Sequence, residues 1–169
     1  SKHYFTPEKI VDIQRSIGSD IMMVLDVCPH GDATYQEHLK AVNVTTQWAK
    51  RCLNHLKNIG PKYDFEQIIS PIIQGGTSKE LRKISADQLI ELNAQMYAIG
   101  GLAVGEPKEE MLKTINFLDE IMPKNKLRYL MGVGTPEDLI ECIKLGIDMF
   151  DCVLPTRLGR TGLAFTTSG

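Results

Sequence analysis

Short apolar runs alternate with helix-forming stretches along the chain, and this alternation restricts the fold more than any other feature of the sequence. The apolar runs that predict strands lie at residues 21–25, 68–73, 97–99, 128–131 and 149–153. Helical patterns with capping signals precede or separate them at residues 7–17, 35–57, 77–93, 111–122 and 135–146. Alternation of this kind predicts βαβ units, a parallel sheet and the α/β class.

Two α/β architectures compete for this pattern, a doubly wound open sheet and a (β/α)₈ barrel. A doubly wound fold would gain support from a G-x-G-x-x-G turn after the first strand. Residues 26–29 read Asp-Val-Cys-Pro instead. A complete barrel needs about 250 residues and eight units, so five predicted units in 169 residues make an incomplete barrel.

Composition limits the class of protein. With 43% hydrophobic residues the chain can bury the core of a single domain, and a net charge of −2 excludes a strongly basic binder without excluding a local RNA-binding patch. The four cysteines show no C-x-x-C spacing, which favours reduced thiols, and no histidine adds a zinc-finger pattern, so we expect no metal site in this chain. Without a leader or a long apolar span, the cytoplasm is the expected location and no membrane partner is expected.

Residues suited to chemistry follow the predicted strands. Asp26 and Cys28 follow the first strand, Gln74 the second and Gly100-Gly101 the third, while Gly132-Val133-Gly134 follows the fourth and Asp151 lies in the fifth. In a barrel the carboxyl ends of all strands open onto one face, where barrel enzymes carry their sites. We therefore expect two carboxylates, one amide and several exposed backbone segments to converge there.

Such a set of groups suits a flat, polar base. Asp26 would accept from an N–H edge of a guanine-like ring, and the Gln74 amide and the Gly101 N–H would donate to its carbonyl oxygen. Met131 would lie against a ring face. Spacing alone does not select a purine over other small polar ligands.

Several long motifs resemble the tRNA-guanine transglycosylase family. They lie at residues 18–21, 73–76, 100–106, 129–134 and 150–157, in the family's order over essentially all 169 residues. The resemblance implies exchange of guanine for a 7-deazaguanine at the wobble position of a tRNA anticodon, in queuosine biosynthesis. Asp151 would be the catalytic nucleophile, forming a covalent ester with the ribose as in a retaining glycosidase. An ionised aspartate needs placement rather than a base to activate it.

The resemblance also assigns binding roles. It implies that Asp26, Gln74 and Gly101 hold the base, with Met131 at the ring. The Leu102 carbonyl, in a peptide oriented by Glu106, would accept from an aminomethyl group, so we expect 7-aminomethyl-7-deazaguanine. The anticodon loop of the tRNA would be gripped by Thr156, Arg157, Leu158, Gly159 and Arg160. The RNA backbone would be contacted by Gly132, Val133, Gly134, Thr135, Pro136, Glu137 and Asp138.

The same resemblance places the chain within a larger protein. It implies a partial (β/α)₈ TIM barrel in which residues 1–169 are the central part of the catalytic domain, with N-terminal strands and a C-terminal structural zinc region outside this chain. The family's Asp-Ser-Gly-Gly segment, credited with acid/base catalysis, is not in the sequence. Val27 and Leu158 depart from the family pattern. The full-length protein is expected to be a homodimer.

Two other functions stay open at this point. The first is a non-catalytic tRNA-binding subunit of the same family, against which the complete motif around Asp151 argues. The second is a small-molecule barrel enzyme that binds phosphate through Gly100-Gly101 or through residues 132–134 and has no affinity for RNA.

Overall fold

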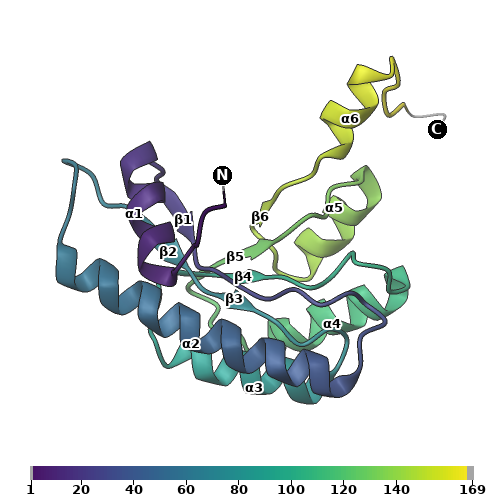
Figure 1. Cartoon of the computed structure of the whole chain (residues 1–169). Coiled ribbons are helices and arrows are strands. Elements are labelled where there is room, and N and C mark those ends of the chain that lie inside the picture. The colour runs from purple at the N-terminus through teal and green to yellow at the C-terminus, as the bar shows by residue number, and fades with distance from the viewer. Residues whose placement is uncertain (1, 167–169) are drawn as a thin grey trace.

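The chain forms parallel strands that alternate with helices, in a computed structural model that describes residues 2–166 (Figure 1). The predicted α/β class is therefore confirmed. The elements, in chain order, are α1 (Pro7–Ile17), β1 (Ile21–Met23), α2 (Tyr35–Ile59), β2 (Ile68–Ser70), β3 (Ile72–Ile73), α3 (Lys79–Ile90), β4 (Met96–Ile99), α4 (Lys108–Ile121), β5 (Leu127–Leu130), α5 (Pro136–Lys144), β6 (Met149–Phe150) and α6 (Leu154–Arg160).

The order of the strands distinguishes the two competing architectures. Every pair is parallel, β1 with β2 and then β3 with β4, β4 with β5 and β5 with β6, so neighbours in space are neighbours in the chain. From α1 to α5 each helix packs against the next one, and α2 and α3 run side by side beneath the strands (Figure 1). A doubly wound sheet would reverse its strand order and place helices on both faces. The arrangement is that of a partial (β/α)₈ barrel, which confirms the predicted architecture.

Proline divides the second predicted strand. The run at 68–73 forms β2, which pairs with β1, and β3, which pairs with β4, with Pro71 between them. Proline has no N–H to donate to a ladder, but its carbonyl still accepts from the N–H of Ala98 at 2.9 Å. One extended segment thus pairs with β1 through its first half and with β4 through its second half.

Side-chain caps determine where most of the helices begin. Thr6, Thr34, Ser78 and Thr135 each accept a hydrogen bond from a backbone N–H in the first turn that follows. The predicted helix at 77–93 is shorter than expected, because Ser78 is its cap and the helix ends at Ile90. This helix has no capping box, because its third residue is Leu81. A capping box is present instead at α2, where the Glu37 side chain accepts a hydrogen bond from the backbone N–H of the cap residue, Thr34.

A continuous apolar core lies between the strands and the ring of helices. All four residues of β4 are buried, and Ile73 and Leu130 lie on its flanks together with Ile115 and Leu118 of α4. Strands covered on both faces read as unbroken apolar runs, which is why the sequence predicts them. The helix α6 is different. It was not predicted, it buries no residue, and it extends away from the other elements (Figure 1).

Candidate functional site

A cavity of about 390 Å³ opens at the carboxyl ends of the strands. Its walls come from segments that follow β1, β4, β5 and β6, and they bring together six of the predicted site residues. Those six are Asp26, Gly101, Leu102, Met131, Gly132 and Asp151. The two carboxylates and the bare backbone therefore converge at the strand ends as expected, but the expected amide of Gln74 is not part of the cavity wall.

The carboxylate of Asp151 is held by one oxygen only. Its Oδ1 accepts from the Tyr129 hydroxyl at 2.6 Å and from the Gly132 N–H at 2.8 Å, whereas no described residue donates to Oδ2. Asp151 itself is exposed, directly after β6. Two donors on one oxygen fix the plane of the group and leave the second oxygen open to the cavity. Among the described residues, no hydrogen bond joins Asp151 to Arg157.

Asp26 lies across the cavity in a different environment. It is partly buried, and its Oδ2 accepts from Nε2 of Gln74 at 2.7 Å. Burial raises the pKa of Asp26, and the hydrogen bond from Gln74 opposes that rise. The structure places the Gln74 side chain behind Asp26 and fully buried, outside the cavity wall, and leaves its Oε1 without a partner among the described residues.

The segment after β4 contributes backbone to the cavity. A Cβ on Gly101 would lie 2.3 Å from Oε1 of Gln74, and its φ of +65° also disfavours a side chain. This glycine therefore lets the chain cross directly over the Gln74 amide. Further along, Glu106 accepts from the N–H groups of Ala103 and, at 3.0 Å, Val104. Because a peptide is planar, holding the Ala103 N–H turns the Leu102 carbonyl to the opposite side, as predicted for Glu106.

Two further residues of the wall were not predicted as site residues, although Cys28 was noted after the first strand. Tyr129 and Cys28 line the cavity. The signal for Tyr129 is strand periodicity, since it lies two residues before Met131, which directly follows β5, and so points to the same side. Burial, and then the hydrogen bond to Asp151, raise the pKa of Tyr129, which keeps the hydroxyl protonated as a donor. Burial followed by the charge of Asp26 raises the pKa of Cys28, so this thiol is poorly suited to act as a nucleophile.

Of the two predicted RNA-contacting segments, the first adjoins the cavity at Gly132 and the second lies in the projecting helix α6. Residues 132–138 form the turn after β5 and the start of α5, where Val133 is buried, Thr135 caps the helix and Asp138 pairs with Lys108. Their remaining surface is mainly backbone and Glu137. Residues 156–160 lie in α6, and both Arg157 and Arg160 are exposed, with no carboxylate partner among the described residues.

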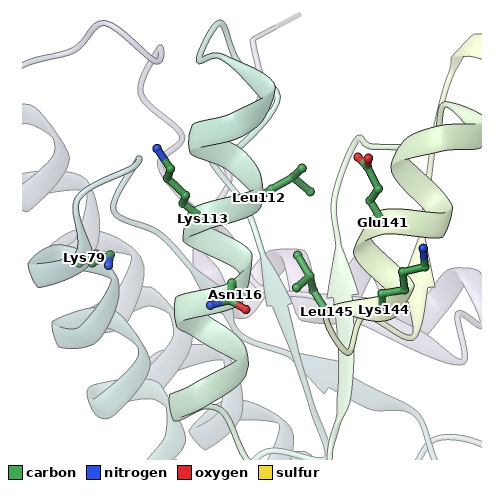
Figure 2. Close-up of a pocket in the computed structure, with 7 residues that line it drawn as sticks. All are labelled: Lys79, Leu112, Lys113, Asn116, Glu141, Lys144 and Leu145. Carbon is green, nitrogen blue, oxygen red and sulfur yellow. The ribbon is translucent and has the colours of Figure 1, made fainter.

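A second hollow, of about 480 Å³, lies on the helical side (Figure 2). Leu112 of α4 and Leu145 after α5 point toward each other across it. The charges at its rim include Lys113, which is paired with Glu109 and Glu110, and Glu141, which is paired with Lys108. It holds no combination of nucleophile, base and bare backbone comparable to that at the strand ends.

No three His, Cys, Asp or Glu side chains gather as a metal site in the part of the chain that the structure describes. Zinc therefore enters no step proposed below. The four cysteines are free, with Cys52 and Cys142 buried in α2 and α5.

Within residues 2–166, no helix combines the length and apolarity needed to cross a membrane.

Comparison with known proteins gives a consistent result. A family model described as queuine tRNA-ribosyltransferase matches residues 1–169. Proteins of that name from Caldanaerobacter subterraneus subsp. tengcongensis and Natranaerobius thermophilus are each 50% identical to the chain over 169 residues, and one from Lawsonia intracellularis is 48% identical. Each alignment covers the whole chain but only 44% of the relative, so the chain spans less than half the length of these proteins.

Proposed function

The chain belongs to the queuine tRNA-ribosyltransferase family, and on that premise we propose that residues 1–169 are the central part of the catalytic barrel of a tRNA-guanine transglycosylase. The full-length protein would exchange guanine at the anticodon wobble position for a 7-deazaguanine, a step of queuosine biosynthesis. The observation that carries this proposal is the cavity in which Asp151, fixed through Oδ1 alone, faces Asp26 and the backbone of residues 100–104.

In the proposed reaction, Oδ2 of Asp151 attacks the anomeric carbon of the target ribose. The bond to guanine breaks, its electron pair leaves with the base, and an ester joins the ribose to the enzyme. A 7-deazaguanine then attacks the same carbon from the opposite face and releases Asp151, so two inversions retain the configuration. The hydrogen bonds from Tyr129 and Gly132 hold the carboxylate for attack, which is the placement that such a step requires.

Selection of the base follows from the opposite wall. The Asp26 carboxylate accepts from the N–H edge, and Gln74 reinforces it from behind at 2.7 Å. The Gly101 N–H serves the carbonyl oxygen of the base, and Met131 lies along the ring. Glu106 accepts from the N–H of Ala103 and so turns the Leu102 carbonyl to the opposite side. This carbonyl accepts a hydrogen bond from a cationic aminomethyl group. This acceptor is the reason for proposing 7-aminomethyl-7-deazaguanine as the substrate.

The tRNA would approach over α6 and the turn at residues 132–138. Arg157 and Arg160 are free to contact phosphates and base edges of an unstacked anticodon loop. The target nucleotide must leave the stack to reach a cavity of about 390 Å³. The full-length protein would act as a homodimer.

The proposal is tested by substituting the nucleophile. In the full-length protein, Asp151→Asn should abolish the denaturant-resistant RNA–protein adduct and base exchange, because an amide cannot form the ester. Asp64→Asn is the matched control, since Asp64 is exposed in the segment between α2 and β2. Adduct formation at the normal level in Asp151→Asn would assign the attack to another residue.

A further inference from the structure

Arg82 is a buried cation behind the cavity that no part of the proposed reaction uses. It lies on α3, its side chain is fully buried, and no carboxylate forms an ion pair with it among the described residues. Its acceptors are three backbone carbonyls: Nε donates to Gly76 at 2.7 Å, Nη1 to Ile73 at 2.8 Å and Nη2 to Gly101 at 3.2 Å. Removing a charge from water is expensive, and an apolar side chain would fill the same volume at lower cost.

The three carbonyls belong to two neighbouring strand ends. Ile73 ends β3, Gly76 follows it, and Gly101 lies in the cavity wall after β4. The guanidinium therefore ties the backbone of the cavity wall to α3 and to the turn before it. The rigid fork of arginine suits this task, because its donors diverge in one plane toward separate acceptors.

The tie fixes the direction of one particular peptide. With the Gly101 carbonyl turned inward to Arg82, the N–H of Leu102 in the same planar peptide points the opposite way. Glu106 holds the N–H of the following peptide, at Ala103. The peptide before Leu102 is therefore held by Arg82 through its carbonyl, and the peptide after Leu102 is held by Glu106 through its N–H. Its own N–H and C=O have no hydrogen-bond partner among the described residues, and both remain for a ligand.

We propose that Arg82 is a positioning residue for base exchange, which presets the peptide between Gly101 and Leu102 so that Leu102 presents its N–H to the incoming base beside the C=O that Glu106 orients. The proposal rests on the proposed function and extends it to a residue that does not touch the substrate. Burial lowers the pKa of Arg82 to about 10, with the charge of Glu106 opposing the change, so the group stays cationic at neutral pH. A permanent charge at this point keeps the carbonyl of Gly101 turned inward.

The test uses the full-length protein and Arg82→Lys, which keeps the charge but cannot reach three carbonyls at once. Its matched control is Arg15→Lys. Arg15 is also buried and donates to a backbone carbonyl, that of Gly60 at 2.6 Å, but it lies outside the cavity wall. Two quantities are measured, the dissociation constant of 7-aminomethyl-7-deazaguanine and amide hydrogen exchange by mass spectrometry.

For Arg82→Lys we expect binding weakened at least about tenfold, because small misplacements of binding groups are costly. Exchange should accelerate at residues 100–106 while residues 79–90 stay protected. Arg15→Lys should bind the base normally. Equal loss of protection in α3 and in the wall, or unchanged affinity in a folded Arg82→Lys protein, would show that Arg82 only packs.

The unsubstituted protein supplies a second measurement that does not depend on a variant folding. The hydrogen-bonded amides of Gly100, Ala103 and Val104 must already be protected from exchange before any base is added, and protection as low as in an unstructured peptide refutes the proposal. If the unsubstituted protein binds neither 7-deazaguanine nor tRNA, it is the proposed function that fails. The exchange pattern of Arg82→Lys then still decides whether this residue orders the wall.

Discussion

Asp26 and Asp151 are two carboxylates of one cavity in opposite environments, which suits opposite roles. Asp151 is exposed and held by two donors, as a nucleophile needs to be. Asp26 is partly buried, and burial raises its pKa above the ordinary value of 3.8. Ionising Asp26 therefore costs the fold stability, a cost absent below pH 3.8 that is incurred as the pH rises through the raised pKa.

This shift predicts a pH dependence of base binding. Because only the ionised carboxylate of Asp26 offers acceptors to two N–H groups, affinity should fall as the pH decreases into the range of its raised pKa. Asp26→Asn in the full-length protein should weaken binding by about 1–3 kcal/mol, since an acceptor becomes a mismatched donor, and should remove this dependence. Calorimetry across the pH range provides the measurement.

The matched control for Asp26→Asn is a substitution in the loop between β1 and α2. Asp32 is 85% exposed, and Asp32→Asn should leave both the affinity and its pH dependence unchanged. Unchanged affinity in Asp26→Asn would remove this residue from base recognition.

At the scale of single residues, the sequence predicted those that a strand end delivers to the cavity. Asp26, Gly101 and Asp151 could be placed because parallel strands bring their carboxyl ends to one face. Tyr129 was missed although its spacing from Met131 is a usable signal, and Arg82 was missed because it lies where helical periodicity predicts an apolar core residue. The signal for Arg82 is an arginine on the buried face of α3, one turn before Ser85 and Ala86.

Among the elements, α6 is the one that we propose to contact the tRNA. It buries no residue and carries Arg157 and Arg160 on its last turn. In the full-length protein, replacing both with alanine should weaken tRNA binding and lower the slope of log affinity against log salt by about 1 for each phosphate that is no longer neutralised. Filter binding of labelled tRNA at several salt concentrations measures both effects.

Arg51→Ala is the matched control for α6. Arg51 is exposed but paired with Glu8 at 2.7 Å, joining α2 to α1. Its loss should leave the salt slope unaltered. An identical slope in the Arg157, Arg160 double variant would mean that α6 does not contact the RNA backbone.

The elements that the sequence predicted well are those with a strong internal period. The apolar strand runs and the capped helices α1 and α5 were found within a few residues. The division at Pro71 was not, because it depends on which neighbour each half of the segment pairs with. Nor was α6 predicted, because a short helix without an apolar stripe has no period to detect.

For the molecule as a whole, the unpaired edge strands determine how the isolated chain should behave. Among the described strands β1 pairs only with β2 and β6 only with β5, so two edges are left that a closed barrel would not have. Unpaired parallel edges favour association with other chains. The residues described also include no evident acid to protonate the leaving guanine, and such assistance contributes about 10²–10⁴ in rate.

We therefore expect the isolated 169-residue chain to self-associate and not to exchange bases. The measurement is incorporation of radiolabelled guanine into unmodified tRNA, with light scattering on the same sample and the full-length protein as reference. Exchange within about tenfold of the reference would mean that the proposed need for an additional acid is mistaken.

The strand order has a consequence for how such a chain acquires its structure. Every ladder joins a strand to the one before it in the chain, and from α2 to α5 every helix packs on the one before it. Each loop that must close therefore spans one βα unit rather than the whole chain, which limits the entropy lost in closing it. A chain leaving the ribosome could add each βα unit to the last without waiting for distant segments. The cavity wall would thus be assembled in the order in which its segments are translated.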